Sequence, residues 1–321
     1  MTTMRAISQD VFGGPEVLRP VLLERPRPLP TEVLVRVVAA GVNPVDAKTR
    51  AGGGMAAVLG EPPFVLGWDV CGVVEETGYG VHTLAVGDEV YGMPWFPRQA
   101  GAYAEYVTAP SRQFARKPRS LDHEEAAAVP LAALTAWQIL VDAADLRPRQ
   151  RVLVHAAGGG VGHFAVQIAK HLGAHVIGTA RAAKHDWLRG LGADELVDYT
   201  AVRFEEVVRE VDLVVDLVGD GHDATSTRSL DVLRPGGLLV AVPSGASPEL
   251  AELAAERGVR ATGFLVEPDG PALARIGELV DAGRLSVEVE EVFPLDRAAE
   301  AHERLAAGRT SGKLVLRVIE A

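Results

Sequence analysis

The sequence has one cysteine, Cys71, among 321 residues. A single cysteine excludes an intrachain disulfide and any cysteine-rich metal site, and it fits a reducing compartment. The residues around it, Val70, Gly72 and Val73, indicate that Cys71 is a small buried hydrophobe. We therefore expect a protein of the cytoplasm.

Long apolar runs and basic clusters are also missing. No uninterrupted apolar segment is long enough to cross a bilayer, and the first residues lack the apolar stretch of a signal peptide. The net charge of −11 opposes binding to nucleic acid or to an anionic membrane. Neither nucleic acid nor a membrane is therefore an expected partner.

Hydrophobic residues make up 48 % of the chain, enough for a large core and two domains. Up to residue 121, short apolar runs broken by Gly and Pro predict a β-rich unit. A helical stretch begins at Asp122, and strands then alternate with helices until Val266, which is typical of a doubly wound parallel sheet. The fold class is therefore α/β, with a sheet domain at 122–266. The predicted helices and strands of 267–321 should rejoin 1–121.

The strongest local signal lies between Arg151 and Lys170, RVLVHAAGGGVGHFAVQIAK. A buried strand runs into a glycine turn at Gly159, Gly160 and Gly162, and an amphipathic helix follows. Glycines let the backbone approach a phosphate closely while the first N–H groups of the helix point at it. We expect a dinucleotide pyrophosphate here, although a glycine-rich turn that binds nothing is the alternative.

The end of the second strand of such a sheet faces the adenosine ribose. Here the segment reads Thr179, Ala180, Arg181, with Lys184 close behind. Basic groups attract a 2′-phosphate, so NADPH is preferred over NADH. The alternative is that Arg181 and Lys184 are an exposed pair at the start of the next helix.

Asn43 and Asp46 follow an apolar run and so lie at a strand end, a common place for a site. An Asx-type turn with Pro44 is the equally good alternative. Met93, Trp95 and Phe96 could line an apolar cleft or form a small cluster beneath a loop.

Metal ligands are scarce. His171 and His175 are four residues apart, but Gly173 between them marks a helix end, so they do not share a helix face. No metal site is predicted from the residues.

Seven motifs occur in one order along the chain: AAGVNPVDAKTRAG, VLGWDVCGVV, GAYAEYV, AAAVPLAALTAW, VLVHAAGGGVGHFAVQIAK, LGADELVDY and VFPLDRAAEAHERLAAGRTSGKLVL. Together they resemble the zinc-free, quinone-oxidoreductase-like branch of the medium-chain dehydrogenase/reductase superfamily. The resemblance covers essentially the whole chain and implies a GroES-like β domain, a Rossmann-like cofactor domain and bound NADPH. Zinc-dependent relatives have Cys at the position of Asn43 and Gly-His-Glu at 67–69, where this chain has Gly-Trp-Asp, and a four-cysteine lobe that is missing here.

The resemblance also implies roles for individual residues. Asn43 resembles the residue that faces nicotinamide and substrate, and it is the one catalytic candidate. The implied cofactor contacts are Asn43, Thr135, Gly159, Gly160, Val161, Gly162, Thr179, Ala180, Arg181, Lys184, Tyr199, Val218, Val242, Phe264, Leu265 and Lys313.

The predicted activity is NADPH-dependent hydride transfer to a quinone or a similar apolar conjugated carbonyl, without zinc. Alternatives are reduction of the C=C bond of an enoyl thioester or an α,β-unsaturated ketone, and a non-catalytic NADPH-binding redox sensor. No proton donor is identifiable, and Tyr91 and Tyr103 are candidates only by proximity to the presumed cleft. By analogy with relatives, a homodimer is expected through the edge strand at 260–265.

Overall fold

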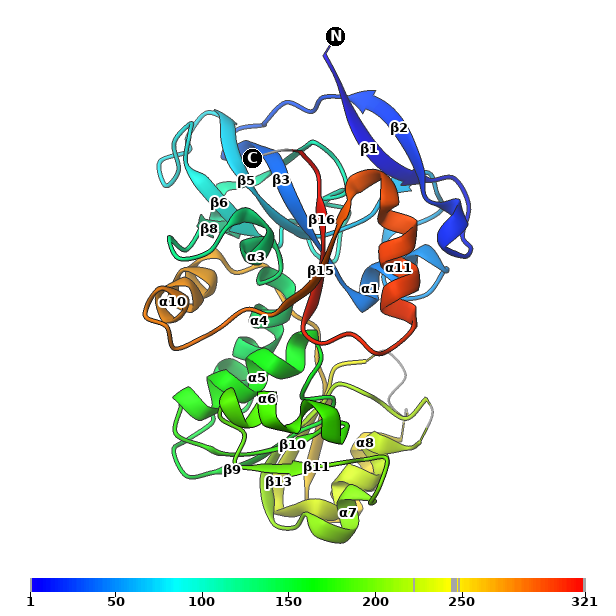
Figure 1. Cartoon of the computed structure of the whole chain (residues 1–321), viewed down its shortest axis with the longest axis vertical. Helices are drawn as coiled ribbons and strands as arrows, with labels where there is room; N and C mark the ends of the chain where they lie inside the picture. Colours follow the sequence, from blue (N-terminus) through cyan, green and yellow to red (C-terminus); the bar gives the residue numbers. More distant parts are fainter. Residues whose placement is uncertain (1, 222, 244–246, 248, 320–321) are drawn as a thin grey trace. The chain divides into compact units, whose positions relative to one another are not determined.

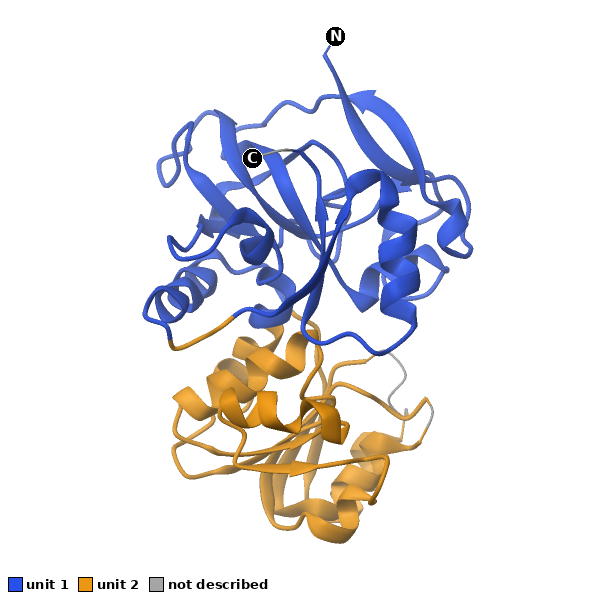
Figure 2. Cartoon of the chain, in the orientation of Figure 1, with its two compact units in different colours: residues 1–134, 267–283, 287–321 blue, residues 135–266, 284–286 orange. Residues whose placement is uncertain are grey.

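The structure is a computed structural model that describes residues 2–221, 223–243, 247 and 249–319. The chain forms two compact units, shown in blue and orange in Figure 2. Unit 1 contains residues 1–134, 267–283 and 287–321, and unit 2 contains residues 135–266 and 284–286.

Unit 1 is built on β-strands from both ends of the chain. A three-stranded sheet has the order β2-β1-β4, and a seven-stranded sheet has the order β15-β16-β3-β5-β6-β8, with β7 also paired to β3. The strands are β1 (Thr3–Gln9), β2 (Arg19–Glu24), β3 (Glu32–Val42), β4 (Phe64–Val65), β5 (Asp69–Thr77), β6 (Glu89–Gly92), β7 (Tyr106–Pro110), β8 (Phe114–Arg116), β15 (Val289–Pro294) and β16 (Lys313–Arg317).

Strand β3 is the centre of the larger sheet. It pairs antiparallel with β16 on one side, where Val42 lies opposite Leu314, and with β5 on the other, where Gly41 lies opposite Asp69. Figure 1 shows the red β16 beside the blue β3. This register brings the end of β3 and the starts of β5 and β16 together.

The helices of unit 1 are short at the N-terminal side and longer near the C-terminus: α1 (Pro44–Arg50), α2 (Ala56–Leu59), α3 (His123–Ala127), α4 (Pro130–Trp137), α10 (Gly270–Asp281) and α11 (Ala298–Ala306). Helix α4 continues past the limit of unit 1 at residue 134. Asp122 caps α3, because its carboxylate accepts the Glu125 N–H at 2.8 Å while the Glu125 carboxylate accepts the Asp122 N–H at 3.0 Å. The helix start predicted at Asp122 is confirmed.

Unit 2 is a six-stranded sheet in the order β11-β10-β9-β12-β13-β14, parallel throughout. Its strands are β9 (Arg151–Val154), β10 (His175–Thr179), β11 (Glu195–Val197), β12 (Val211–Asp216), β13 (Leu233–Ala241) and β14 (Arg260–Gly263), and its helices are α5 (Gly160–His171), α6 (His185–Gly190), α7 (Phe204–Val207), α8 (Thr225–Ser229) and α9 (Leu250–Glu256). Counted from β9, this is the 3-2-1-4-5-6 order of dinucleotide-binding folds, which confirms the predicted doubly wound sheet.

The long helical stretch predicted after Asp122 is interrupted. Pro130 begins a new helix, because a proline has no N–H to continue the preceding one, and a π-helical segment follows at Gln138–Ala143. Helix α3 packs against β3 and β5, so the contacts assign residues 122–134 to unit 1, whereas the sequence placed the limit at 121. The domain limits themselves stay a prediction.

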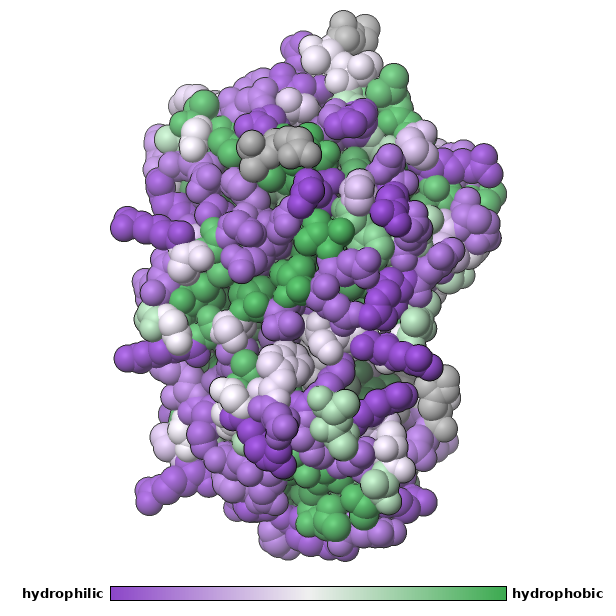
Figure 3. Space-filling model, in the orientation of Figure 1, coloured by the Kyte–Doolittle hydropathy of each residue, from purple (hydrophilic) through white to green (hydrophobic). Residues whose placement is uncertain are grey.

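Hydrophilic residues cover most of the face drawn in Figure 3, and the apolar residues on it lie in separate groups. Among the described residues, no helix has the length and apolarity that a membrane crossing requires.

Candidate functional site

The glycine turn of unit 2 has the geometry that a phosphate needs. Ala156, two residues after the end of β9, takes a positive φ of 48°, and Gly159 is the extended N-cap of α5. A Cβ on Gly162 would lie 2.3 Å from the Ala156 carbonyl oxygen and 2.7 Å from Ala157 Cα, so this position requires glycine. Because residue 162 is glycine, the first turn of α5 can pack closely against the backbone that follows β9.

The first N–H groups of α5 belong to Gly160, Val161 and Gly162, and a helix has no internal acceptors for them. Together with the helix dipole they favour an anion at this end. No side chain caps the helix at Gly159. These residues fit the pyrophosphate of a dinucleotide.

The end of β10 adds basic groups beside this turn. The exposed Arg181 donates from Nε to the Tyr199 hydroxyl at 3.1 Å. Lys184 reaches back over the turn and donates from Nζ to the Gly158 carbonyl at 3.1 Å. The structure thus brings together three of the residues predicted around a 2′-phosphate.

One acidic residue in this region was not considered in the sequence. The Asp198 carboxylate accepts the Ala182 N–H at 3.2 Å, and its two hydrogen bonds from Thr200 lower its pKa. It also acts on Arg181 through its charge. Asp198 therefore orders the loop that carries the basic pair.

A buried histidine at the end of β9 also escaped the sequence analysis. His155 Nδ1 lies 3.1 Å from Thr179 Oγ1, and Nε2 lies 2.9 Å from Ser229 Oγ. Because the Ser229 hydroxyl donates to the Thr225 carbonyl, Nε2 must carry the proton. Burial lowers the pKa of His155 to about 4, so the neutral ring links the ends of β9 and β10.

The other predicted cofactor contacts of unit 2 differ in burial. Thr135, Thr179 and Ala180 are buried, Val242 and Phe264 are half-buried, and Val218 and Leu265 are exposed. The Val218 N–H donates to Asp216 and the Val242 N–H to the Asp216 carbonyl, so both follow the end of β12. Their contact with a cofactor stays a prediction.

In unit 1, Asn43 and Lys313 meet at the strand ends described above. Lys313 Nζ donates to Asn43 Oδ1, to the Val42 carbonyl at 3.2 Å and to Asp69 Oδ2 at 3.4 Å. Asn43 Nδ2 donates to the same Asp69 oxygen at 2.8 Å. Asn43 is the residue before α1, with Pro44 in its first turn, so the predicted turn is a helix start.

A second chain of buried polar groups runs into Asp46. Tyr103 donates to Asp46 Oδ2 at 3.0 Å, His302 Nε2 lies 3.0 Å from the Tyr103 hydroxyl, and Arg50 Nη1 lies 3.2 Å from His302 Nδ1. Burial raises the pKa of Asp46 to about 7 and lowers that of His302 to about 3. Tyr103 and Asp46 were named in the sequence, but their link to His302 was not.

The remaining candidates of unit 1 are engaged in packing. The Tyr91 hydroxyl donates to the Leu273 carbonyl at 2.6 Å. Trp68 donates to the Arg98 carbonyl at 2.6 Å and meets the Phe96 ring edge-on at 5.3 Å. Cys71 is fully buried, which raises the pKa of its thiol and leaves it unreactive.

The donor set at Asn43, Trp68 and Asp69 does not fit zinc. It offers an amide, an indole and one carboxylate, and a buried ammonium already binds both the amide and the carboxylate. A metal ion placed there would be repelled by Lys313. Across the described part of the chain, no three His, Cys, Asp or Glu side chains gather as a metal site needs.

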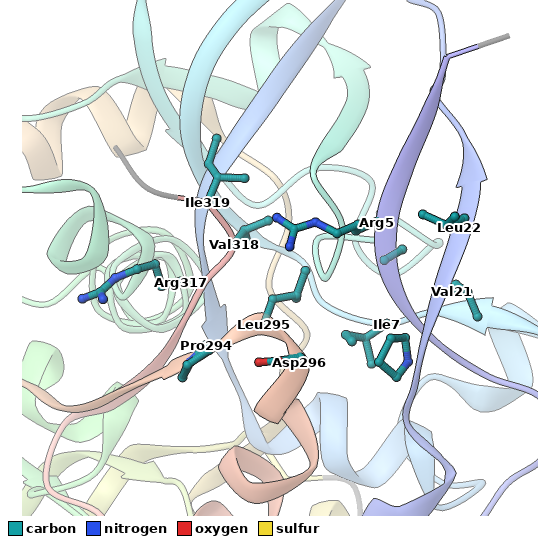
Figure 4. A pocket seen from close by; sticks show the side chains of 12 residues that line it. Arg5, Ile7, Val21, Leu22, Pro294, Leu295, Asp296, Arg317, Val318 and Ile319 are labelled. Atoms are coloured by element: carbon teal, nitrogen blue, oxygen red, sulfur yellow. The ribbon is translucent and has the colours of Figure 1, made fainter.

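Figure 4 shows a pocket of about 570 Å³ in unit 1, between β1, β2 and the segment after β16. Its lining includes the apolar side chains of Ile7, Leu295 and Val318 and the charged side chains of Arg5 and Asp296. None of the predicted site residues lines it.

A parallel sheet in this order, with a glycine turn opening α5, defines a dinucleotide-binding protein. The comparisons with known proteins agree. Residues 29–119 match the alcohol dehydrogenase GroES-like domain, and residues 191–316 match the family described as zinc-binding dehydrogenase.

Three similar proteins span nearly the whole chain. NAD(P)H oxidoreductase RTN4IP1, mitochondrial, of Danio rerio is 34 % identical over 99 % of this chain and 92 % of its own length. The 2-methylene-furan-3-one reductase of Solanum lycopersicum is 34 % identical over 98 % of this chain and 79 % of its own. The Escherichia coli quinone oxidoreductase, solved in complex with NADPH, is 30 % identical with a TM-score of 0.87 and covers 99 % of this chain and 100 % of its own.

The chain belongs to the medium-chain dehydrogenase/reductase superfamily, in its quinone-oxidoreductase-like branch.

Proposed function

We propose that the protein is an NADPH-dependent reductase that delivers hydride to a quinone or a similar apolar conjugated carbonyl without zinc. The observation that carries this proposal is the glycine turn with Arg181, Tyr199 and Lys184 beside it, which suits a dinucleotide that bears a 2′-phosphate. The similar proteins named above are an NAD(P)H oxidoreductase, a reductase and a quinone oxidoreductase with NADPH.

Different residues would bind different parts of the cofactor and the acceptor. The N-terminus of α5 would hold the pyrophosphate, and Arg181 with Lys184 would hold the 2′-phosphate. NADPH supplies the hydride when it is bound. Asn43 would face the acceptor, whose conjugated carbonyl is already electrophilic and so needs no metal to activate it.

The side chains of Asn43, Trp68 and Asp69 support zinc independence. The positively charged Lys313 ammonium already binds Asn43 and Asp69, so a metal ion would have to compete with it for these two side chains. A homodimer through the exposed strand β14 and a place in the cytoplasm remain predictions from the sequence.

Reduction of an activated C=C bond is the second candidate, and the similarity to the tomato reductase favours it. A panel of para-quinones, ortho-quinones, α,β-unsaturated ketones and an enoyl thioester, each with NADPH and a no-acceptor control, separates the candidates. We expect the quinones to give the highest kcat/KM. Turnover of the enones or the thioester alone would favour the second candidate, and tight NADPH binding with no turnover would favour a sensor.

Arg181 offers a direct test of the cofactor assignment. In Arg181→Ala, the KM for NADPH should rise by about tenfold, because one exposed charged contact with the 2′-phosphate is lost. The KM for NADH should stay unchanged, because NADH has no 2′-phosphate. The measurement is steady-state kinetics with each cofactor at a saturating quinone concentration. Arg189→Ala, an exposed arginine of α6 paired with Asp186, is the matched control. Equal changes for NADPH and NADH would contradict the 2′-phosphate role.

A further inference from the structure

Lys313 uses every hydrogen-bond donor that it has. Its side chain is only 2 % exposed, and an ammonium carries three N–H donors. Three acceptors surround it: the Val42 carbonyl, Asn43 Oδ1 and Asp69 Oδ2. In this arrangement no donor is left for a cofactor, which differs from the contact that the family resemblance implies for Lys313.

The two charged neighbours fix which way the Asn43 amide points. Oδ1 accepts from the Lys313 ammonium, and Nδ2 donates to the Asp69 carboxylate. A flipped amide would put its NH₂ group against an ammonium and its oxygen against a carboxylate, and both contacts would be repulsive. The orientation of Asn43 is therefore determined by charge.

The backbone of Asn43 is held as firmly. Its N–H donates to Asp46 Oδ2 at 2.7 Å, and its carbonyl accepts the Asp46 N–H at 3.0 Å. Asp69 is held in turn, because its Oδ1 accepts the Leu131 N–H at 2.7 Å. Within the described residues, the second hydrogen on Asn43 Nδ2 is the one polar hydrogen of this residue that no hydrogen bond uses.

We infer that Lys313 and Asp69 are positioning residues, which lock the Asn43 amide so that its remaining N–H is donated to the oxygen of the acceptor. This inference rests on the proposed function. Bound NADPH would supply a hydride to the acceptor and would itself be oxidised to NADP⁺; the acceptor oxygen would take up the negative charge, the Asn43 N–H would donate to it, and water would supply the proton that neutralises it. A fixed donor in dry surroundings, next to an ammonium, stabilises that charge as it develops.

A positioning role for Lys313 predicts different kinetics from a role in binding the cofactor. A residue that orients a donor acts on the transition state and changes kcat, whereas a residue that binds cofactor changes the affinity for NADPH. A residue that only supports the fold changes stability.

The test uses Lys313→Met, which keeps an unbranched side chain, one heavy atom shorter, and removes its charge. We expect kcat with a quinone to fall by about tenfold to a hundredfold, while the Kd for NADPH stays within about twofold. NADPH deuterated at the transferred hydrogen should show a larger isotope effect on kcat than with the wild type, because hydride transfer becomes slower. Lys313→Arg, which keeps the charge, should recover part of the lost rate.

Two further variants separate positioning from stability. Lys117→Met removes another lysine of unit 1, which is half-buried as a residue and has a side chain only 8 % exposed. Its ammonium donates to the Leu121 carbonyl at 2.6 Å and the Pro118 carbonyl at 3.3 Å, and it pairs with Glu89 at 3.4 Å. This variant should lower the Tm but not kcat. The double variant Asp69→Asn/Lys313→Met removes the carboxylate that Lys313→Met leaves without its ammonium, so it should regain Tm relative to Lys313→Met while kcat stays low.

The outcomes are distinct. A Kd for NADPH that rises tenfold in Lys313→Met with an unchanged kcat would overturn the inference in favour of a cofactor contact. A kcat that recovers along with Tm in the double variant would overturn it in favour of a structural role. A wild-type protein that turns over no acceptor would remove the proposed function, and the inference with it.

Discussion

At the scale of single residues, the buried carboxyl group of Asp46 has the most unusual surroundings. It is fully buried, its Oδ2 accepts from Tyr103 and from the Asn43 backbone, and its Oδ1 has no hydrogen-bond partner among the described residues. Burial, with a smaller effect of the Asp69 charge, raises its pKa to about 7 from its ordinary value of 3.8. The folded protein therefore holds a proton that the unfolded chain has already lost.

This difference predicts how stability depends on pH. From about pH 4 to about pH 7 the folded state binds more protons than the unfolded state, so the contribution of Asp46 to the free energy of unfolding falls as pH rises. In Asp46→Asn that fall should disappear. Relative to the wild type, the variant should gain stability on the order of a few kcal/mol between about pH 5 and about pH 8.

Urea unfolding of both proteins across this range measures the difference. Asp186→Asn, which changes a fully exposed carboxylate, is the control and should run parallel to the wild type. If the curves of Asp46→Asn and the wild type also run parallel, the pKa of Asp46 is not raised by folding.

The contacts between these single residues could not be predicted from the sequence. Asn43 was recognised because it follows an apolar run, but nothing near it in sequence points to Lys313, which is 270 residues away. His302 gave no signal either, because it sits in an ordinary amphipathic helix and acts through Tyr103. Contacts of this kind depend on the strand register, which is a property of the folded sheet.

At the scale of elements, the turn between β9 and α5 depends most directly on its amino acids. Gly162→Ala would place a methyl group 2.3 Å from the Ala156 carbonyl oxygen, so either α5 or the end of β9 must move. We expect a lower Tm and a Kd for NADPH raised by about tenfold or more, since the anion site loses its geometry. Thermal unfolding and NADPH fluorescence titration measure these two effects.

Gly190→Ala is the matched control, since a Cβ at Gly190 in α6 meets nothing within 4 Å. It should keep the Kd for NADPH and raise stability by up to about 1 kcal/mol, because alanine favours helix. Normal NADPH binding by Gly162→Ala would mean that the turn does not hold the pyrophosphate.

The sequence predicted helices and strands better than it predicted contacts between single residues. The strands of unit 2 were predictable because strands that are buried on both faces are continuous apolar runs, as in Val152 to Val154. The stretch after Asp122 was harder, because alanine-rich segments favour helix on both sides of Pro130 and the break depends on that one residue.

At the scale of the whole molecule, both ends of the chain build one sheet. Strands β15 and β16 join β3, so the residues after 286 complete the unit that the first residues begin. We expected residues 267–321 to rejoin 1–121 from their own helix and strand pattern as well as from the family resemblance, and the strand pairing gives the register of that return. This strand pairing matters for the chemistry of the site, because it brings Lys313 into contact with Asn43 and Asp69.

The central claim is that the protein transfers hydride from NADPH to a conjugated carbonyl without a metal. The most direct test is the rate of NADPH oxidation with a para-quinone by protein stripped of metal with a chelator, compared with NADH and with the same protein after zinc is added back. We predict rapid turnover with NADPH, a clearly lower kcat/KM with NADH, and no change when zinc is added. Loss of activity on stripping that zinc restores, or equal use of both cofactors, would contradict it.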